Sequence, residues 1–180
     1  MVAAGAASAA PAAHVAHVAH LASNGIQENV LYTHYYEDFK VGETIEIGRH
    51  TVTQDEILDF AKKYDPQPFH IDAEAAKTSI YGGLIASGWH TCAILMRVMV
   101  DAYVSKAASM GSPGMEEIRW LKPVRPDDTL VFKRTVEEAR HTSKPDRGLV
   151  LSRWDVYNQR DEHVMMMRGY GLFGRRPAGP

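Results

Sequence analysis

The sequence predicts a single α+β domain built from one long apolar helix and an antiparallel sheet. Its 180 residues are enough for one domain with a sizeable core and too few for two. The stretch from about Gly88 to Ala108 is apolar on most sides, which is typical of a buried helix. Four strand-like stretches follow Ser112-Pro-Gly114, and the short turns between them favour antiparallel connections.

The N-terminal stretch is Ala-rich and carries no charge before Glu28. It predicts a disordered tail over residues 1–30, followed by a domain over residues 31–180. The tail shows neither the basic start and apolar core of a secretory signal nor the arginines of a mitochondrial transit peptide, so we expect a cytoplasmic protein. The spacing of His14, His17 and His20 could align three imidazoles, but nothing nearby would support a metal, and no metal site is predicted.

The charge balance excludes several classes of partner. The chain has 20 basic and 22 acidic residues and a formal net charge of -2, so no overall field attracts nucleic acid or a membrane surface. The single cysteine, Cys92, excludes an internal disulfide and a cysteine-based zinc cluster. It falls in the apolar helix, where a small buried hydrophobe is expected rather than a nucleophile. No cofactor is predicted.

The segment before the long helix contains a strand and a short helix. Residues 39–42 are typical of a turn, and residues 43–48 alternate as a strand does. Thr53 and Glu56 have the spacing of a capping box, which predicts a helix that starts there and stops at Asp65-Pro66. Residues 73–78 are expected to add a turn or two of helix.

A carboxylate and an imidazole lie five residues apart in the next segment. Pro66 and Pro68 remove backbone donors and favour extended conformations at the residues before them, so Asp65 to His70 is predicted to be a stiff, non-helical loop. Such a loop can hold both side chains on one target. Gly88 stands where the long helix begins, so its N–H could face an oxyanion. The structural alternative is that Asp65 caps a turn and His70 only packs.

Within the long helix, Arg97 and Asp101 are one turn apart and are expected to form an ion pair on its less buried face. His90, in the first turn, is a candidate for a substrate contact. The sheet is predicted to be a meander of successive strands because turn residues separate each strand from the next. The predicted strands are Met115 to Val124, Thr129 to Arg140, Gly148 to Tyr157 and Val164 to Phe173.

The pattern Asp65-Pro-x-Pro-x-His70-x-Asp72, followed by Gly-Gly-Leu-Ile-x-x-Gly88, resembles the hydratase motif of the MaoC-like, (R)-specific enoyl-CoA hydratase/dehydratase family. The resemblance extends from about Tyr36 to Arg175. It implies a hot-dog fold, in which the antiparallel sheet wraps around the central helix. It also implies edge-to-edge pairing of sheets, so we expect a homodimer or a higher homo-oligomer.

The resemblance implies a hydro-lyase that reversibly hydrates trans-2-enoyl thioesters to (R)-3-hydroxyacyl thioesters. In that reaction Asp65 would be the general base, His70 would orient the water and take part in proton transfer, and the Gly88 N–H would stabilise the enolate oxygen. Ser87 and His90 are predicted to contact the substrate. That substrate would be an acyl thioester of coenzyme A or acyl carrier protein, and the sequence leaves the group that protonates its α-carbon unassigned.

Two departures from the family motif keep other functions open. Family members usually carry His-Gly where this chain has Ser87-Gly88, and often a serine near Ala93. These replacements favour a non-catalytic acyl-thioester binder as one alternative. A hot-dog thioesterase is another, but many place a carboxylate early in the central helix, and here none precedes Asp101. Six basic residues near strand ends and turns could meet coenzyme A phosphates but are expected to be solvated surface charges: Lys122, Arg125, Lys133, Arg134, Lys144 and Arg147.

Overall fold

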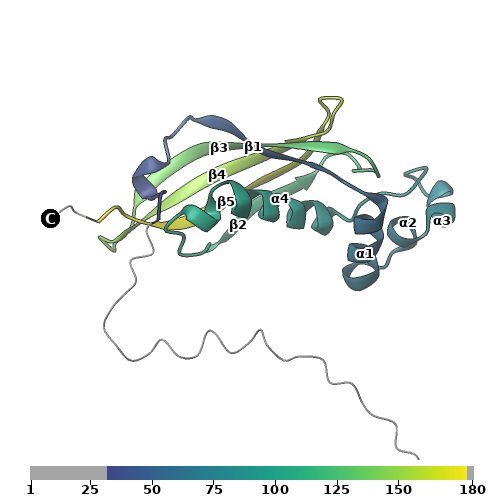
Figure 1. Cartoon of the computed structure of the whole chain (residues 1–180), viewed down its shortest axis with the longest axis horizontal. Helices are drawn as coiled ribbons and strands as arrows, with labels where there is room; N and C mark the ends of the chain where they lie inside the picture. The colour runs from purple at the N-terminus through teal and green to yellow at the C-terminus, as the bar shows by residue number, and fades with distance from the viewer. Residues whose placement is uncertain (1–31, 178–180) are drawn as a thin grey trace, which may run out of the picture. The chain divides into compact units, whose positions relative to one another are not determined.

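The computed structural model describes residues 32–177, so the predicted tail over residues 1–30 lies outside the described part of the chain. In that part a five-stranded antiparallel sheet curves around one long helix, α4 (Gly88–Ala102), which lies along the inner face of the sheet (Figure 1). This confirms the α+β class and the hot-dog arrangement of sheet and helix. None of the helices within residues 32–177 has the length and apolar character needed to cross a bilayer.

The strand order is β1-β3-β4-β5-β2. The three strands β3, β4 and β5 form the predicted meander, but the meander prediction was wrong for β2, which pairs with β5 and lies at the sheet edge. Period-two alternation reports which face of a strand is apolar, and it carries no information on which strand lies beside it. The strand bounds are β1 (Thr44–Thr51), β2 (Gly114–Trp120), β3 (Thr129–His141), β4 (Arg147–Tyr157) and β5 (His163–Gly174).

The core lies between α4 and the inner face of the sheet. Leu95 of α4 is fully buried, as are Phe132 of β3 and Met165 of β5. Burial of one such side chain contributes about 1.5–3 kcal/mol relative to leaving it exposed. Trp154 of β4 and Met167 of β5 belong to the same core and are 4% and 7% exposed.

Helix α4 is shorter than predicted. It ends at Ala102 because Tyr103 has φ -151° and leaves the helical conformation. A 3₁₀ turn, η2 (Val104–Lys106), follows. The predicted Arg97–Asp101 pair is present, with Nε of Arg97 donating to Asp101 at 2.8 Å. At the same end of the molecule, η1 (Tyr36–Asp38) leads through the predicted turn at Gly42 into β1.

Three short helices lie together beyond the start of α4 (Figure 1): α1 (Gln54–Tyr64), α2 (Pro68–Ile71) and α3 (Ala73–Lys77). Thr53 caps α1, its hydroxyl accepting from the Glu56 N–H at 3.2 Å. The reciprocal half of the predicted capping box does not form, since the Glu56 carboxylate instead contacts Nε2 of His50 at 2.9 Å. The predicted helical turns at residues 73–78 correspond to α3.

Helix α2 corrects the prediction of a non-helical loop between Asp65 and His70. Pro68 stands in its first turn, where its missing N–H would have no helical partner in any case and its fixed φ suits a helix. The two prolines therefore end α1 and start α2 rather than excluding a helix. His70 projects from this single turn, and Asp65 from the end of α1.

Candidate active site

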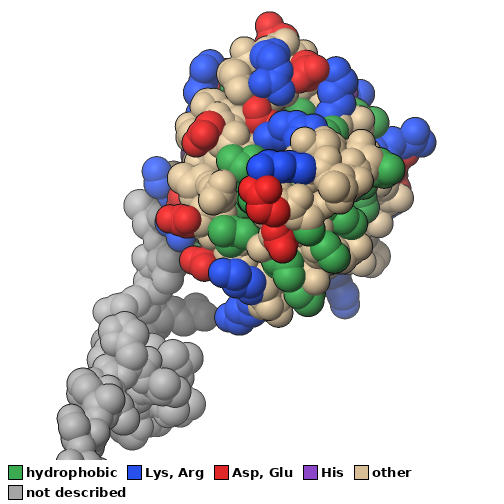
Figure 2. Space-filling view, turned by 90° about the vertical axis from the view of Figure 1, so that its right-hand side faces the viewer, with side chains coloured by type: hydrophobic (Ala, Val, Ile, Leu, Met, Phe, Trp, Pro, Cys, Tyr) green, Lys and Arg blue, Asp and Glu red, His purple; other side chains and the backbone are tan. Residues whose placement is uncertain are grey.

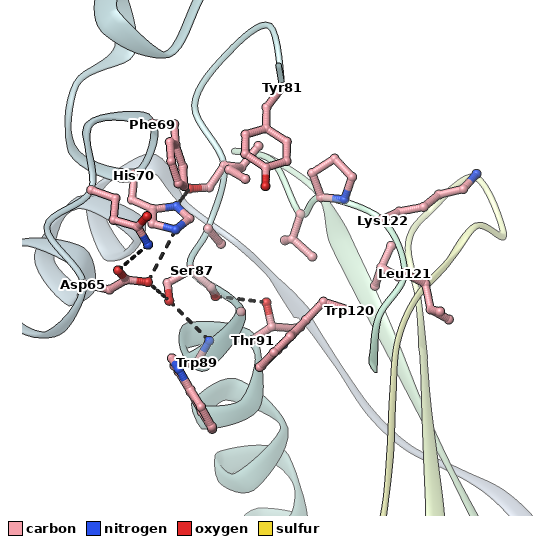
Figure 3. A pocket seen from close by; sticks show the side chains of 17 residues that line it. Asp65, Phe69, His70, Tyr81, Ser87, Trp89, Thr91, Trp120, Leu121 and Lys122 are labelled. Atoms are coloured by element: carbon pink, nitrogen blue, oxygen red, sulfur yellow. Dashed lines mark hydrogen bonds and ion pairs between the residues drawn. The ribbon is translucent and has the colours of Figure 1, made fainter. Parts of the chain in front are cut away.

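A cavity of about 450 Å³ opens at the end of the molecule where α4 begins. Its walls come from the end of α1, from α2, from the segment that leads into α4, and from the chain that leaves β2 (Figure 3). The polar side chains of Asp65, His70 and Ser87 lie on one side of it, and Trp120 and Leu121 lie across from them. The predicted Asp/His pair and the start of α4 are thus brought to one cavity.

Asp65 occupies the C-terminal cap of α1 with non-helical backbone angles, which directs its side chain toward the cavity. Its Oδ1 accepts from Nε2 of Gln67 at 2.8 Å, and its Oδ2 accepts from Oγ of Ser87 at 2.6 Å. Partial burial by itself would raise the pKa of Asp65, but these two hydrogen bonds and the nearby charge of His70 hold it below the ordinary value. The carboxylate is therefore ionised at neutral pH.

His70 is 5% exposed, and its two ring nitrogens have different surroundings. Nδ1 lies 2.8 Å from the carbonyl oxygen of Ile85. A carbonyl can only accept, so Nδ1 carries a proton and any second proton of the ring must reside on Nε2. Nε2 lies 3.4 Å from Oδ2 of Asp65, which is long for a direct hydrogen bond but leaves both atoms able to contact one water.

Ser87 is the N-cap of α4 and is 1% exposed. Its hydroxyl accepts from the Trp89 N–H at 3.3 Å and donates to Asp65. It lines the cavity, as a substrate contact would require, but its one proton is committed to the carboxylate. The arrangement makes Ser87 a link between the start of the helix and Asp65.

Gly88 is the first residue of α4, so its N–H has no acceptor one turn earlier within the helix. The helix dipole adds positive potential at this point. The indole of Trp120 lies so close that a Cβ on residue 88 would come within 2.5 Å of the ring. Glycine is therefore required here by close packing, and Trp120 limits the space over the helix start.

His90 is not brought together with Asp65 and His70. Its ring is 6% exposed and stacks on Phe60 of α1, with ring centroids 4.8 Å apart and planes at 15°. Burial lowers the pKa of His90 and so favours the neutral ring, although the nearby charge of Glu56 acts in the opposite direction. The structure thus places His90 between α4 and α1, and it is not among the side chains that line the cavity.

Cys92 is half-buried, with its sulfur 3.8 Å from that of Met165. Burial raises the pKa of the Cys92 thiol, which agrees with a packing residue and not with a nucleophile.

The sequence reasoning missed several side chains of the cavity, above all Trp89 and Trp120. Their rings meet edge to face at 5.4 Å, and they are 59% and 48% exposed. Tyr81 and Thr91 also line the cavity. The sequence shows the two tryptophans, but no pattern along the chain indicates that the end of β2 lies beside the start of α4.

The family model described as a MaoC like domain matches residues 38–152, which includes every residue of the Asp65, His70 and Gly88 arrangement. The chain belongs to the MaoC-like family. The crystal structure of the MaoC-like dehydratase from Rhodospirillum rubrum superposes on this MaoC-like chain with a TM-score of 0.74 at 41% identity, covering 80% of this chain and 99% of that one.

Two further relatives are similar in sequence to this chain. The (R)-specific enoyl-CoA hydratase of Rhodospirillum rubrum is 26% identical over 111 residues, which are 59% of this chain and 72% of that protein. The uncharacterized protein YdeM of Bacillus subtilis (strain 168) is 28% identical over 130 residues, which are 71% of this chain and 90% of that protein.

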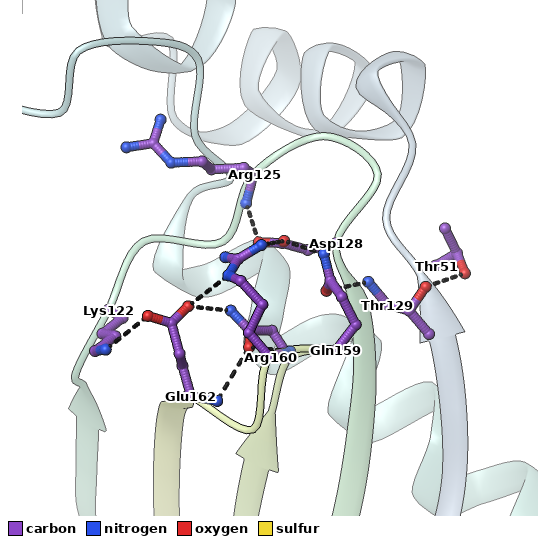
Figure 4. A network of polar contacts seen from close by, with 9 residues as sticks. Thr51, Lys122, Arg125, Asp128, Thr129, Gln159, Arg160 and Glu162 are labelled. Carbon is purple, nitrogen blue, oxygen red and sulfur yellow. Dashed lines mark hydrogen bonds and ion pairs between the residues drawn. The ribbon is translucent and has the colours of Figure 1, made fainter.

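A polar network reaches the cavity through Lys122 (Figure 4). Lys122 lines the cavity and donates to Glu162 at 2.8 Å. Hydrogen bonds from Asn158, Lys122 and Arg160 lower the pKa of Glu162 to about 2. Arg125, which donates to the Tyr81 carbonyl at 2.6 Å, is likewise engaged. Six basic residues were considered above as contacts for coenzyme A phosphates, and of these only Lys122 lines this cavity within the described part of the chain.

The end of the molecule that carries α1, α2 and α3 has a mixed surface. Figure 2 shows hydrophobic side chains there between acidic and basic ones, with no large area of one sign. Such a surface lacks the extended basic area that would attract a nucleic acid.

Proposed function

We propose that this protein reversibly hydrates the double bond of trans-2-enoyl thioesters. The observation that supports this most directly is the pairing of an ionised Asp65 with His70, whose Nε2 lies 3.4 Å away, beside the free N–H of Gly88 in one cavity. Membership of the MaoC-like family and the similarity to an (R)-specific enoyl-CoA hydratase support the same reaction class. The (R) configuration of the product rests on that similarity.

The proposed reaction starts with a water held by Asp65 and Nε2 of His70. Asp65 takes a proton from the water, and the water oxygen bonds to C3 of the substrate. The electron pair of the double bond moves toward the thioester oxygen, which accepts a hydrogen bond from the N–H of Gly88. This scheme requires His70 to start with a proton on both ring nitrogens. C2 takes the proton of Nε2, and the proton that Asp65 took from water then passes to Nε2, so that one water is added and both residues are restored.

A thioesterase is the main alternative because the hot-dog fold is shared by both activities. The carboxylate of Asp101 cannot serve it, since its side chain is 57% exposed and is bonded to Arg97 at the far end of α4. Asp65 is the one carboxylate that lines the cavity among the described residues. The two activities differ in which bond of the substrate changes.

The deciding experiment supplies a short trans-2-enoyl-CoA to the full chain and follows the conjugated double bond and free thiol together. We expect loss of conjugation without thiol release, and a 3-hydroxyacyl thioester that chiral chromatography identifies as (R). Thiol release with an intact double bond would support a thioesterase. Tight binding with neither change would support a non-catalytic binder. Comparing acyl chain lengths, and coenzyme A with acyl carrier protein thioesters, would define the substrate.

We further propose that the chain forms a homodimer or a higher homo-oligomer through β2 and the outer side of α4. Strand β2 pairs with β5 on one side only, and an unpaired edge can accept another strand. Large apolar side chains on these two elements and just after β2 are 39–59% exposed: Trp89, Met96, Met115, Trp120 and Leu121. A second copy would cover them and would lie next to the cavity.

A further inference from the structure

A second cavity, of about 630 Å³, lies at the opposite end of the molecule. It is formed by η1, by β1 and β3, and by the C-terminal end of α4. The fifteen residues of α4 separate it from the Asp65 site, which corresponds to about 20 Å along the helix axis. Its volume falls in the range typical of small-molecule sites.

The buried charge at this cavity is that of Arg134 of β3, which is 5% exposed, whereas Lys40, the other cation of the Lys/Arg type in the lining, is exposed. Its guanidinium is stacked between two aromatic rings, 5.1 Å from the centroid of Phe39 and 4.8 Å from that of Tyr103. Within residues 32–177 its Nε has no hydrogen-bond partner. The carboxylate of Glu43 is 3.7 Å from Nη2, which is beyond hydrogen-bonding distance.

A buried guanidinium that lacks a hydrogen-bonded carboxylate is unusual. It carries five N–H donors, and moving its charge out of water is costly unless an anion and hydrogen bonds replace the water. The two aromatic faces compensate part of the charge through cation–π contact, but they accept none of the in-plane N–H groups of Arg134. The Nε donor of Arg134 therefore remains without a partner among residues 32–177, while the side chains of Glu43 and Tyr103 lie beside the guanidinium.

The neighbouring carboxylates are already engaged. Asp38 accepts from Nη2 of Arg176 at 2.8 Å, and Glu46 accepts from Nε of Arg49 at 2.7 Å. Only Glu43 remains to offset Arg134 among the acidic residues that line the cavity. Apolar side chains also line the cavity, including those of Ile45 and Ile47.

We propose that this cavity binds an organic monocarboxylate, whose carboxylate accepts hydrogen bonds from Arg134 and whose apolar body lies against Phe39, Ile45 and Tyr103. A carboxylate matches the planar fork of a guanidinium with two parallel hydrogen bonds. A phosphate dianion fits less well, because Glu43 and the other carboxylates around the rim repel a second negative charge. This ligand site is separate from the proposed hydration chemistry.

The test uses the full chain with octanoate as probe and with octanamide and inorganic phosphate as comparisons. We expect calorimetry to show one octanoate bound per chain. Octanamide, which lacks the charge, and phosphate, which lacks the matching shape, should each bind at least about tenfold more weakly. The Nε–H resonance of Arg134 should shift in nitrogen–proton spectra as octanoate is added. Equal binding of octanamide, stronger binding of phosphate, or no octanoate binding at millimolar concentration would overturn the proposal.

Two variants locate the binding. Arg134→Met should weaken octanoate at least about tenfold, yet without ligand it should be as stable as the parent chain or more so, because a poorly compensated buried charge is removed. Lys133→Gln is the matched control, since Lys133 is the neighbouring residue on β3, is exposed, and has its ammonium over the ring of Tyr157. Octanoate should bind this control as it binds the parent.

The second variant, Ile45→Trp, reduces the cavity without touching the charge, at a position that is 38% exposed and so tolerates a larger side chain. It should abolish octanoate binding while the chain stays folded. Unchanged affinity in Arg134→Met, or in Ile45→Trp, would place octanoate elsewhere in the protein and refute the site.

Discussion

The hydroxyl of Ser87 donates to Oδ2 of Asp65 across 2.6 Å, so the residue that caps α4 also holds the carboxylate at the end of α1. This hydrogen bond stabilises the ionised form of Asp65 and is one reason why its pKa is lowered. It connects the start of the central helix to the proposed base, and it has consequences for the dependence of turnover on pH.

Ser87→Ala should move the acid limb of the pH profile of kcat/KM to higher pH. A base must be ionised to act, and loss of the hydroxyl raises the pKa of Asp65, so activity should fall away at a higher pH than in the parent. The lost cap should also cost about 1 kcal/mol of stability. Thr53→Ala is the control, since it removes the cap of α1 without touching Asp65. An acid limb that does not move would separate Ser87 from the tuning of Asp65.

Asp65→Asn and His70→Ala should each lower turnover about 10²-fold or more and leave the fold intact. Asparagine keeps the shape of the side chain but removes the basic charge, and alanine removes the second contact of the water. Since both residues act on one water, the double variant should be far more active than the product of the two losses suggests. Initial rates with a trans-2-enoyl-CoA and far-ultraviolet circular dichroism provide the measurements. Near-normal hydration by Asp65→Asn would eliminate the Asp/His mechanism.

Gly88→Ala should destabilise the protein by about 1–3 kcal/mol in urea unfolding, because the added methyl overlaps the Trp120 ring. In a chain that already carries Trp120→Ala, the Gly88→Ala substitution should cost much less, since the ring that the methyl overlaps is absent. If the changes in unfolding free energy of the two substitutions were additive instead, the close contact between Gly88 and Trp120 would not contribute to the loss of stability.

The unaltered protein should be a dimer or a larger homo-oligomer in light scattering at micromolar concentration. Met115→Glu should shift it toward the monomer, because Met115 is 39% exposed on the unpaired edge strand β2 and a charge buried there is unfavourable. Val41→Glu is the matched control, since Val41 is 61% exposed in the turn before β1. A stable monomer for the parent chain would contradict the proposed assembly.

The sequence by itself determined most of the helices and strands and the family to which the chain belongs. Strand-like patterns located all five strands to within a few residues at their boundaries, and apolar breadth located α4. Thr53 marked the start of α1 because an N-cap is a contact between residues near in the chain. Asp65, His70 and Gly88 were found by a local motif. Each of these features depends on short-range geometry, which the order of residues encodes directly.

Only the tertiary structure decided which distant residues meet. It placed β2 beside β5, brought Trp120 over Gly88, and set the carbonyl of Ile85 against His70. It also turned His90 toward Phe60 and away from the cavity, although His90 is two residues from Gly88. Hydrophobic burial is non-directional, so an apolar pattern tells which side of an element is covered and leaves the covering partner open. That partner is chosen when helix and sheet pack together into one core.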